Sequence, residues 1–472
     1  MQYTKISPAI KRNLVTLLEK FPLVPTIAQE VHKNGGRIFL VGGAVRDLLL
    51  DIPVKDVDLE VHGIAMPKLE MILKQFGSVD YVGKAFGVFK FFQANGIAID
   101  ISLPRTDSAG RKPVVQIDPF ISLEDAFRRR DVTINAMGID LITDELIDPF
   151  GGYTDLQNKR LRATDLTLFV EDPLRFYRVM QFIGRFAMEP DEQLNQLCAH
   201  MDLHMVSIER IEKEFEKLLL KSVSPSRAIR WLKTINRLHD LFPEIYALIG
   251  VAQEPKWHPE GDVFEHSMQT LDAAAGFEYD DDAQKLIVMY AALCHDLGKV
   301  TTTRILAGKI ISYGHETESA RFAKQLLRRI TGKLVVIDTV IKLVACHMQP
   351  LQFIACGAKP AAYKRLAHRL APQATIATLA LLARADRLGR NPVGHAPLTI
   401  AEPDVDLFIQ KAQLADVLTQ AEAPVLLGRD LIDLVEPGPR MGRLLQRAYE
   451  IQIEEGIKDK DVLKERVLHK KV

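Results

Sequence analysis

Apolar and polar positions alternate along the first third of the chain in a way that predicts strands. Residues 37–41 are a mainly apolar run that ends at two glycines, and residues 56–61 alternate between acidic and apolar side chains. Successive side chains of a strand point to opposite faces, so a period of two predicts a strand with one buried face. Residues 87–92 and 97–103 read as two further strands joined by an Asn-Gly turn. A mixed α/β unit is therefore predicted from residue 37 to about residue 150.

From about residue 160 onward the apolar residues take the spacing of helices. Leu174, Val179 and Phe182 repeat at helical intervals, and strand patterns are almost absent. The predicted fold class is α+β, with a mixed α/β head followed by helices. Breaks in composition predict five segments: a helical amino-terminal extension over 1–36 broken by Pro22 and Pro25, the head over 37–160, a helical neck over 161–253, a second helical domain over 254–395, and a helical tail over 396–472.

Composition narrows the class of protein only a little. The 61 basic residues balance 61 acidic ones, which excludes a uniformly basic nucleic-acid binder but not local basic patches. None of the four cysteines pairs in a C-x-x-C motif, so neither a disulfide framework nor a thiolate zinc site is expected. The amino end lacks the apolar region of a signal peptide, and no uncharged apolar run reaches about 18 residues. We therefore expect a soluble cytoplasmic protein without a membrane partner.

A pair of glycines, Gly42 and Gly43, separates the first predicted strand from a helical pattern. Glycine lets the backbone approach a phosphate closely, and the first N–H groups of the helix face the same anion. Arg46 lies one turn inside that helix, and its planar guanidinium suits a phosphate. A Gly-Gly turn alone also fits a purely structural tight turn, so the residues that follow it decide between the two interpretations.

Two aspartates, Asp56 and Asp58, follow this turn at the spacing of one strand face. Neighbouring carboxylates raise each other's pKa unless a cation lies between them, and Mg²⁺ prefers such oxygen ligands together with phosphates. Asp100, on a later strand, is a candidate third carboxylate, whereas Glu60 is expected to be part of a solvated strand face. The sequence therefore predicts a magnesium site next to a phosphate-binding turn.

Three further motifs follow in order: Arg-Arg-Arg-Asp-Val-Thr-Ile-Asn-Ala-Met at 128–137, Asp-Pro-Phe-Gly-Gly-Tyr-Thr-Asp-Leu at 148–156, and Glu-Asp-Pro-Leu-Arg-Phe-Tyr-Arg at 171–178. Together with the glycine turn and the two aspartates, they resemble the class II nucleotidyltransferases, the family of bacterial-type tRNA CCA-adding enzymes and poly(A) polymerases. The resemblance is dense over residues 37–186. It implies a polymerase-beta-like nucleotidyltransferase head with Mg²⁺ at the aspartates.

The resemblance also assigns roles to single residues. Arg130 would bind phosphate, Asp131 and Asn135 would hold the shape of the site, and Arg178 would lie near the triphosphate. The residues implied are catalytic Asp56, Asp58 and Asp100, and nucleotide-binding Gly42, Gly43, Arg46, Arg130, Asp131, Asn135, Asp172, Arg175 and Arg178. Arg128 is expected at a solvated helix end.

Asp172 and Arg175 together predict a choice of base. Asp172 followed by proline is typical of a helix N-cap, and Arg175 lies three residues further on. A carboxylate only accepts hydrogen bonds and a guanidinium only donates them. Cytosine and adenine offer an amino donor beside a ring-nitrogen acceptor, whereas uracil and guanine offer the reverse. The pair therefore favours C and A over U and G.

A second constellation consists of histidines and aspartates in the third quarter of the chain. His295 and Asp296 are adjacent, within Cys-His-Asp-Leu-Gly-Lys, and both side chains are suitable ligands of a divalent transition metal. The set resembles the HD superfamily of metal-dependent phosphohydrolases, with His266, His295, Asp296 and Asp386 as its core and His315 and His347 at the positions of a second metal. Metal binding is expected, and hydrolytic activity stays an open alternative. Cys294 and Cys346 are interpreted as buried packing residues.

The leading hypothesis is a template-independent nucleotidyltransferase that adds the 3′-terminal CCA to tRNA from CTP and ATP, with an HD-type helical domain and a helical tail. Rival hypotheses are a poly(A) polymerase or partial CC- or A-adding enzyme, an HD phosphohydrolase with a nucleotide-sensing head, and a tRNA-binding module without chemistry. The tRNA acceptor arm needs local basic surface. Candidates for that surface are Lys359, Lys364, Arg365, Arg369, Arg440, Arg443 and Arg447. The sequence leaves the oligomeric state and the HD-site metal open.

Overall fold

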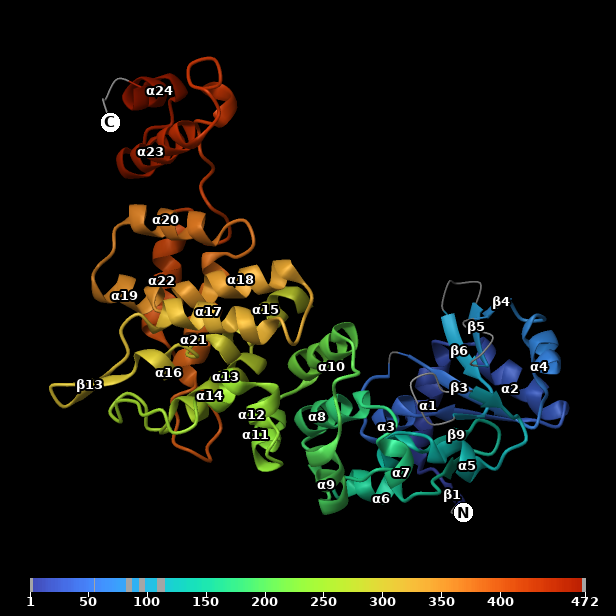
Figure 1. The fold of residues 1–472 in the computed structure, drawn as a ribbon. Coiled ribbons are helices and arrows are strands. Elements are labelled where there is room, and N and C mark those ends of the chain that lie inside the picture. The colour runs from blue at the N-terminus through green and yellow to red at the C-terminus, as the bar shows by residue number, and fades with distance from the viewer. Residues whose placement is uncertain (1–2, 55, 82–86, 93–97, 108–114, 469–472) are drawn as a thin grey trace. The chain divides into compact units, whose positions relative to one another are not determined.

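The structure is a computed structural model that describes residues 3–54, 56–81, 87–92, 98–107 and 115–468 (Figure 1). It divides into two compact units, Met1–Val206 and Ser207–Val472, called here the amino-terminal and the carboxy-terminal unit. The predicted Asn95-Gly96 turn lies outside the described residues. The five predicted segment limits stay predictions.

The amino-terminal unit is built around an eight-stranded mixed sheet in the order β1-β10-β9-β2-β3-β6-β5-β4. Its strands are β1 (Tyr3–Lys5), β2 (Arg37–Val41), β3 (Asp58–His62), β4 (Ser78–Tyr81), β5 (Val88–Phe92), β6 (Ala98–Ser102), β9 (Gly138–Asp140) and β10 (Glu145–Ile147). Strand β3 pairs antiparallel with β2 and parallel with β6. The mixed α/β head predicted from residue periodicity is thus confirmed.

Helices and short strand pairs complete this unit (Figure 1). The helices are α1 (Pro8–Glu19), α2 (Leu23–Lys33), α3 (Gly43–Leu49), α4 (Met66–Leu73), α5 (Leu123–Arg128), the 3₁₀ helix η2 (Thr133–Asn135), α6 (Gly152–Gln157), α7 (Leu166–Phe169), α8 (Leu174–Phe186) and α9 (Glu192–His200). The short pairs are β7 (Arg105–Asp107) with β8 (Val115–Ile117), and β11 (Arg160–Leu161) with β12 (Glu189–Pro190). Phe39 and Val41 of β2 pack on Ala126 and Phe127 of α5 in one buried cluster.

The amino-terminal extension is more than the expected helical segment. Its first residues form β1, which pairs antiparallel with β10 and so joins the main sheet. Pro22 directly precedes α2, as a break would, but Pro25 lies within the first turn of α2 and does not interrupt it. The first turn tolerates proline because its N–H groups have no partner inside the helix.

The carboxy-terminal unit is helical apart from one hairpin (Figure 1). Its helices are α10 (Ile208–Lys221), α11 (Ser226–Thr234), α12 (Leu238–Leu241), α13 (Pro243–Tyr246), α14 (Val263–Ala275), α15 (Asp282–Cys294), α16 (Lys299–Thr302), α17 (His315–Leu327), α18 (Leu334–Cys346), α19 (Gln349–Ala355), α20 (Pro360–Leu370), α21 (Ile376–Leu388), α22 (Pro403–Leu414), the 3₁₀ helix η3 (Gly428–Asp430), α23 (Pro439–Glu455) and α24 (Lys460–Leu468). The helical character predicted for this region is confirmed.

The hairpin of β13 (Arg304–Leu306) and β14 (Lys309–Ile311) was not predicted. Its two-residue turn is Ala307-Gly308, and both residues have positive φ, 50° and 74°. Such a turn matches the twist of the two strands, but it usually carries Asn-Gly or Asp-Gly. With alanine at the first position and strands of three residues, the sequence gives only a weak hairpin signal.

One helical stretch of the described residues, Leu334–Ala355, is long and apolar enough to cross a membrane by length and composition. Buried core helices meet the same criterion. Val340, Leu343 and Val344 of this stretch are buried within the carboxy-terminal unit, so the stretch is weak evidence for a membrane span.

A close backbone approach at Gly298 joins the start of α16 to the first turns of α17. Its N–H donates to Ser319 Oγ at 2.8 Å. A Cβ atom at Gly298 would lie 2.2 Å from His315 O and 2.5 Å from Ser319 N. Only glycine therefore fits, and this contact holds Asp296 beside His315.

We predict that Gly298→Ala lowers the free energy of unfolding of the carboxy-terminal unit by about 2 kcal/mol or more, because two backbone segments must separate. Urea denaturation followed by tryptophan fluorescence measures this, since both tryptophans, Trp231 and Trp257, lie in this unit. The matched control is Gly332→Ala, whose Cβ would meet nothing within 4 Å. Equal stability of the two variants would contradict the packing argument.

Candidate functional site

The glycine turn of the head connects β2 to α3. Gly42 has φ +70°, which glycine adopts without strain, and a Cβ there would lie 2.8 Å from Arg130 Nη1. Glycine at this position therefore leaves room for the Arg130 guanidinium. The helix that follows is only seven residues long.

The three predicted carboxylates lie on neighbouring parts of the sheet. Asp58 begins β3, directly opposite Asp100 of β6 in the parallel register, and Asp56 precedes β3. All three residues are exposed, whereas Val57 and Leu59 between them are buried. Among the described residues of the head, no three acidic or histidine side chains bring their ligand atoms within 4.8 Å of one another.

The pKa of Asp58 is raised above its ordinary value. Partial burial of the carboxylate raises this pKa, and the positive charge of Arg130 lowers it. The negative charges of Asp100 and Asp56 raise the pKa further. A bound cation would favour the charged forms and reverse this shift. The donor set of hard oxygens beside an arginine therefore fits Mg²⁺ with a phosphate.

Glu60 corrects an expectation, because it is not part of a solvated face. It is fully buried, and its carboxylate contacts His62 at 3.0 Å, Arg129 at 3.3 Å and Arg130 at 3.4 Å. Burial alone raises the pKa of Glu60, but the hydrogen bond with His62 and the charges of Arg130 and Arg129 lower it to about 2. Glu60 thus holds Arg130 against the glycine turn.

Arg46 lies elsewhere than expected for a phosphate ligand. Its side chain is buried, with Nε and Nη2 donating to Asp47 Oδ1 at 2.9 and 2.6 Å and Nη1 donating to Asn135 Oδ1 at 2.7 Å. Its guanidinium also stacks over Phe186, 4.5 Å from the ring centre. In this structure Arg46 ties α3 to Asn135 and α8, and its fork is not presented to a phosphate.

Asp131 and Asn135 are buried and form one network with Arg178, which is partly exposed. Asp131 accepts from Arg178 Nε at 2.6 Å and from Asn135 Nδ2 at 2.9 Å. Burial raises the pKa of Asp131, but Arg178 and Asn135 lower it to about 2. These contacts suit residues that hold the shape of a site. Arg128, predicted at a helix end, pairs with Glu124 one turn earlier at 2.7 Å.

Asp172 and Arg175 lie at the start of α8. Asp172 Oδ1 accepts from Leu174 N at 3.2 Å, as a capping residue does. Arg175 donates from Nη1 to Leu168 O at 2.7 Å and from Nη2 to Arg129 O at 2.5 Å. These two bonds fix the guanidinium plane, and a second N–H remains on each Nη.

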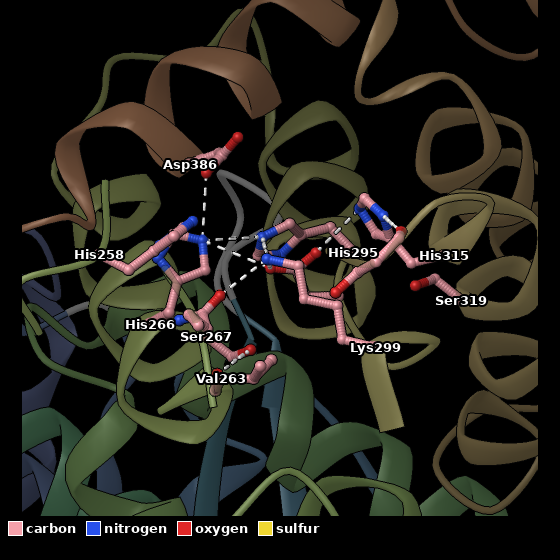
Figure 2. Close-up of polar contacts among 12 residues, drawn as sticks. His258, Val263, His266, Ser267, His295, Lys299, His315, Ser319 and Asp386 are labelled. Carbon is pink, nitrogen blue, oxygen red and sulfur yellow. Dashed lines mark hydrogen bonds and ion pairs between the residues drawn. The ribbon is translucent and has the colours of Figure 1, made fainter. Parts of the chain in front are cut away.

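The carboxy-terminal unit brings all six predicted metal ligands together in two adjoining groups. Figure 2 shows His266, His295, His315 and Asp386 among them. His266 Nε2 lies 3.1 Å from Asp386 Oδ1 and 3.2 Å from His295 Nε2. His315 Nε2 lies 3.1 Å from His347 Nε2. All six side chains are buried.

Asp296 lies between the two groups of ligands. Its Oδ2 is 3.3 Å from His295 Nε2, and its Oδ1 is 3.2 Å from His315 Nε2. Nitrogen ligands about 2.0–2.1 Å from one ion lie roughly 3.0–3.4 Å apart. These residues would therefore hold divalent cations, with Asp296 lying between the two groups of ligands.

Backbone carbonyls fix which nitrogen of each ring faces the centre. Nδ1 of His295, His315 and His347 donates to a carbonyl three residues earlier, at 2.9, 2.8 and 2.7 Å. A carbonyl only accepts, so the proton is on Nδ1 and the lone pair of Nε2 points inward. Burial and the charges of His295 and His315 also lower the pKa of His347 to about 3, which keeps this ring neutral. Burial lowers the pKa values of His266 and His315, but their contacts with Asp386 and Asp296 raise both above the ordinary value.

Several residues of this centre were not predicted. Glu260 is fully buried, and its Oε1 lies 2.8 Å from Nδ1 of both His258 and His266. Lys299 Nζ lies 2.7 Å from Asp296 Oδ2, and Arg390 Nη2 donates to Asp386 Oδ1 at 2.8 Å. The sequence held a signal for both cations, because each follows an acidic ligand candidate by one helical turn. Lys299 comes three residues after Asp296, and Arg390 comes four residues after Asp386.

A cavity of about 500 Å³ opens onto this centre. Its walls include Asp296, His315, His347 and Asp386. Cys294 and Cys346 are buried packing residues, as predicted. The predicted basic surface is partly paired within the unit, because Lys364 contacts Glu422 and Arg365 contacts Glu450.

Comparisons with known proteins agree with this arrangement. Residues 38–162 match the family model of the poly A polymerase head domain, and residues 263–391 match that of the HD domain. The chain is 38% identical over 304 residues to the multifunctional CCA protein of Pasteurella multocida, which covers 62% of this chain and 69% of that protein. It is 37% identical over 321 residues to the multifunctional CCA protein of Aromatoleum aromaticum, and this match covers 66% of this chain and 74% of that protein.

Two solved structures share the fold over nearly the whole chain. The Thermotoga maritima CCA-adding enzyme complexed with tRNA has a TM-score of 0.58 at 20% identity and covers 99% of both chains. The Bacillus stearothermophilus CCA-adding enzyme in complex with CTP has a TM-score of 0.60 at 22% identity and covers 94% of this chain and 97% of that one. At such identities these matches concern the fold alone.

We predict that Glu60→Gln destabilises the head by roughly 2–4 kcal/mol at pH 7, because it removes the charge that the two arginines surround. The folded-state pKa of about 2 lies below the ordinary 4.5. The contribution of Glu60 is therefore present above pH 4.5 and is lost as the pH falls towards 2. Hydrogen-exchange protection of β3 at pH 7 and pH 3.5 should show the gap between variant and wild type shrinking in acid. The control, Glu124→Gln, changes an exposed carboxylate, and an equal loss in both variants would contradict the role of Glu60.

Proposed function

The chain belongs to the family of multifunctional CCA proteins, and from this premise we propose that it adds the 3′-terminal CCA to tRNA from CTP and ATP and releases pyrophosphate. One observation carries the proposal. Asp58 and Asp100 face each other on neighbouring strands, with Arg130 and the glycine turn nearby, in a head domain of this family. The proposed partners are the tRNA acceptor arm, CTP and ATP, and the proposed location is the cytoplasm.

The proposed reaction is attack of a primer 3′-hydroxyl on the α-phosphate of the nucleotide. Asp56 and Asp58, with Asp100 opposite, would hold Mg²⁺, which supplies charge neutralisation and a lower pKa for the hydroxyl. Arg130 would contact the phosphates from its place over Gly42, because Glu60 keeps its guanidinium there. Catalysis then consists of positioning and charge stabilisation.

The choice of nucleotide is proposed to reside in Asp172 and Arg175. The backbone carbonyls of Leu168 and Arg129 hold the Arg175 guanidinium. Its remaining N–H groups can then donate to the ring nitrogen of cytosine or adenine, while Asp172 accepts from the amino group. Each such contact discriminates by about 1–3 kcal/mol. The pair admits both C and A, so poly(A) or partial CC or A addition stays a rival outcome.

We predict that Asp58→Ala lowers nucleotide addition by at least about a hundred-fold, because the metal loses a ligand at the reacting phosphate. The assay incubates the full chain with tRNA lacking its 3′ end and with CTP and ATP singly and together, and the product lengths are read by mass spectrometry. Extension by three residues with both nucleotides supports CCA addition, whereas long adenosine tails would point to a poly(A) polymerase.

The matched control for this prediction is Asp80→Ala, which removes an exposed carboxylate on the edge strand β4. It should add nucleotides at the wild-type rate. Circular dichroism checks that both variants fold. Near-normal addition by a folded Asp58→Ala variant would overturn the catalytic assignment.

The HD-type centre is proposed to be a second, hydrolytic site for phosphoesters. His266, His295, Asp296 and Asp386 would hold one divalent transition metal, and His315 and His347 a second one across Asp296. Such ions supply a nucleophilic hydroxide and polarise the phosphate. Lys299 and Arg390 line the same cavity and would neutralise the charge of the bound phosphate.

We predict that His295→Ala removes bound metal and phosphodiesterase activity while nucleotide addition stays within about two-fold of wild type, because the ligands lie in a separate unit from the head. Metal content by mass spectrometry and hydrolysis of bis(p-nitrophenyl) phosphate measure the first effect. His368→Ala, which changes an exposed histidine of the same unit, should alter neither activity. Joint loss of both activities in a folded His295→Ala variant would argue against two separate sites.

A further inference from the structure

We propose that Asn13, in helix α1 of the amino-terminal extension, is a positioning residue for the proposed magnesium site of the head. It acts through Asp51, which lies in the connection from α3 to Asp56. The inference rests on the proposed nucleotidyltransferase function and deepens it. It gives a role in metal binding to a segment that precedes the residues matching the head-domain model, 38–162.

The amino-terminal extension is fixed to the edge of the main sheet. Strand β1 pairs with β10, and Lys5 Nζ donates at 2.7 Å to Thr143 O, in the turn between β9 and β10. Lys11 Nζ, in α1, donates to Asp144 Oδ2 of the same turn at 2.5 Å. Helix α1 is thereby held at a defined place on the head, and Asn13 lies two residues after Lys11.

Asp51 has a backbone conformation that needs support. Its φ is +58°, in the left-handed region that residues other than glycine enter at a cost and keep where surrounding contacts fix them. Asn13 Nδ2 donates to Asp51 Oδ1 at 2.8 Å, between residues 38 apart in the sequence. Asp144 shows the same combination, since its φ is +54° and Lys11 of the extension contacts its carboxylate. The extension therefore holds two left-handed aspartates of the head.

Apolar packing places α1 against the same connection. Helix α1 packs on α3 (Figure 1). A cavity of about 230 Å³ is bounded on one side by α1, including Asn13 and Leu17, and on the other by Leu48, Asp51 and Val54. Leu17, Leu48 and Val54 are all buried. The extension therefore covers the connection where it leaves α3, and the Asn13 hydrogen bond lies at the rim of this packing.

The position of Asp56 depends on this connection more than that of Asp58 does. Asp58 begins β3 and pairs with Asp100 of β6, so the sheet holds it. Asp56 lies two residues before β3 and five residues after Asp51. A shift of Asp51 would therefore move one candidate metal ligand relative to the other. Mg²⁺ demands near-ideal octahedral geometry, so such a shift would weaken its binding.

The first test is the Mg²⁺ dependence of nucleotide addition to tRNA lacking its 3′ end by the full chain. Asn13→Ala should raise the Mg²⁺ concentration for half-maximal addition about ten-fold and leave kcat at saturating Mg²⁺ within about two-fold, because the ligands remain but are less well oriented. Val15→Ala changes an exposed residue of the same helix and should keep the wild-type dependence. A folded Asn13→Ala variant with an unchanged Mg²⁺ dependence would overturn the proposal.

Reversing the hydrogen bond separates positioning from a general loss of stability. Asn13→Asp places two carboxylates opposite each other and should raise the half-maximal Mg²⁺ concentration at least as much as Asn13→Ala. Adding Asp51→Asn restores one donor and one acceptor, and asparagine tolerates the left-handed φ of this position. The double variant should return to within about two-fold of wild type, because the two residues are coupled. A double variant no better than Asn13→Asp alone would refute the positioning role.

Hydrogen exchange supplies a measurement that needs no nucleotide addition. In the metal-free chain, the backbone amides of Ile52, Val54 and Val57 should exchange faster in Asn13→Ala than in wild type, because the connection loses its hydrogen bond to α1. Strands β9 and β10 should keep their protection. Added Mg²⁺ should protect the three amides in both proteins, at about ten-fold higher concentration in the variant. Identical exchange of these amides in both proteins would contradict the proposal.

The outcomes separate the role of Asn13 from the proposed function. If the wild-type chain adds no nucleotides while Mg²⁺ protects the connection with the expected difference between wild type and Asn13→Ala, the proposed function fails and the positioning role stands. If the wild-type chain completes the tRNA end and Asn13→Ala matches it in both measurements, the positioning role fails and the proposed function stands.

Discussion

One buried carboxylate, that of Asp296, organises the carboxy-terminal unit. A buried carboxylate and four buried imidazoles are stable only with compensating partners, since burial disfavours charged groups. Lys299 supplies one charge at 2.7 Å, and backbone carbonyls fix the rings of His295, His315 and His347 with Nε2 inward. His266 comes from α14, His295 from the end of α15, His315 from the start of α17, His347 from the end of α18 and Asp386 from α21. The packing of these helices and the geometry of the centre are thus one and the same constraint.

The head also contains a buried carboxylate, that of Glu60, but its charge is compensated in a different way. Glu60 is as deeply buried as Asp296, but it contacts Arg129 and Arg130, which carry the compensating charge. Within that network the arginine charges compensate the carboxylate charge, and Glu60 orients Arg130. The centre around Asp296 instead gathers four imidazoles and the carboxylate of Asp386, a donor set that would suit divalent cations. The buried acid of the head therefore positions another residue, while the buried acid of the second unit lies among candidate metal ligands.

In both units, hydrogen bonds to backbone carbonyls fix the orientation of side chains at the candidate sites. Arg175 donates to the carbonyls of Leu168 and Arg129, and the rings of the HD-type centre donate to carbonyls three residues earlier. An anchored side chain loses less conformational freedom when a ligand binds, so more of the contact energy appears as affinity.

The sequence alone determined the features that depend on neighbouring residues. Strand β2, the glycine turn, the acidic alternation that leads into β3 and the helical second unit all follow from local periodicity, and the motifs carried the six metal-ligand candidates and the family. The tertiary structure decided what depends on distant residues. Residue periodicity placed Glu60 on a solvated face, whereas in the structure it is buried and contacts Arg129 and Arg130, about seventy residues away. The pairing of β1 with β10 and the contact of Arg46 with Asn135 are likewise long-range contacts. A periodic pattern reports which face of an element is apolar, but it carries no information about the element that will cover that face.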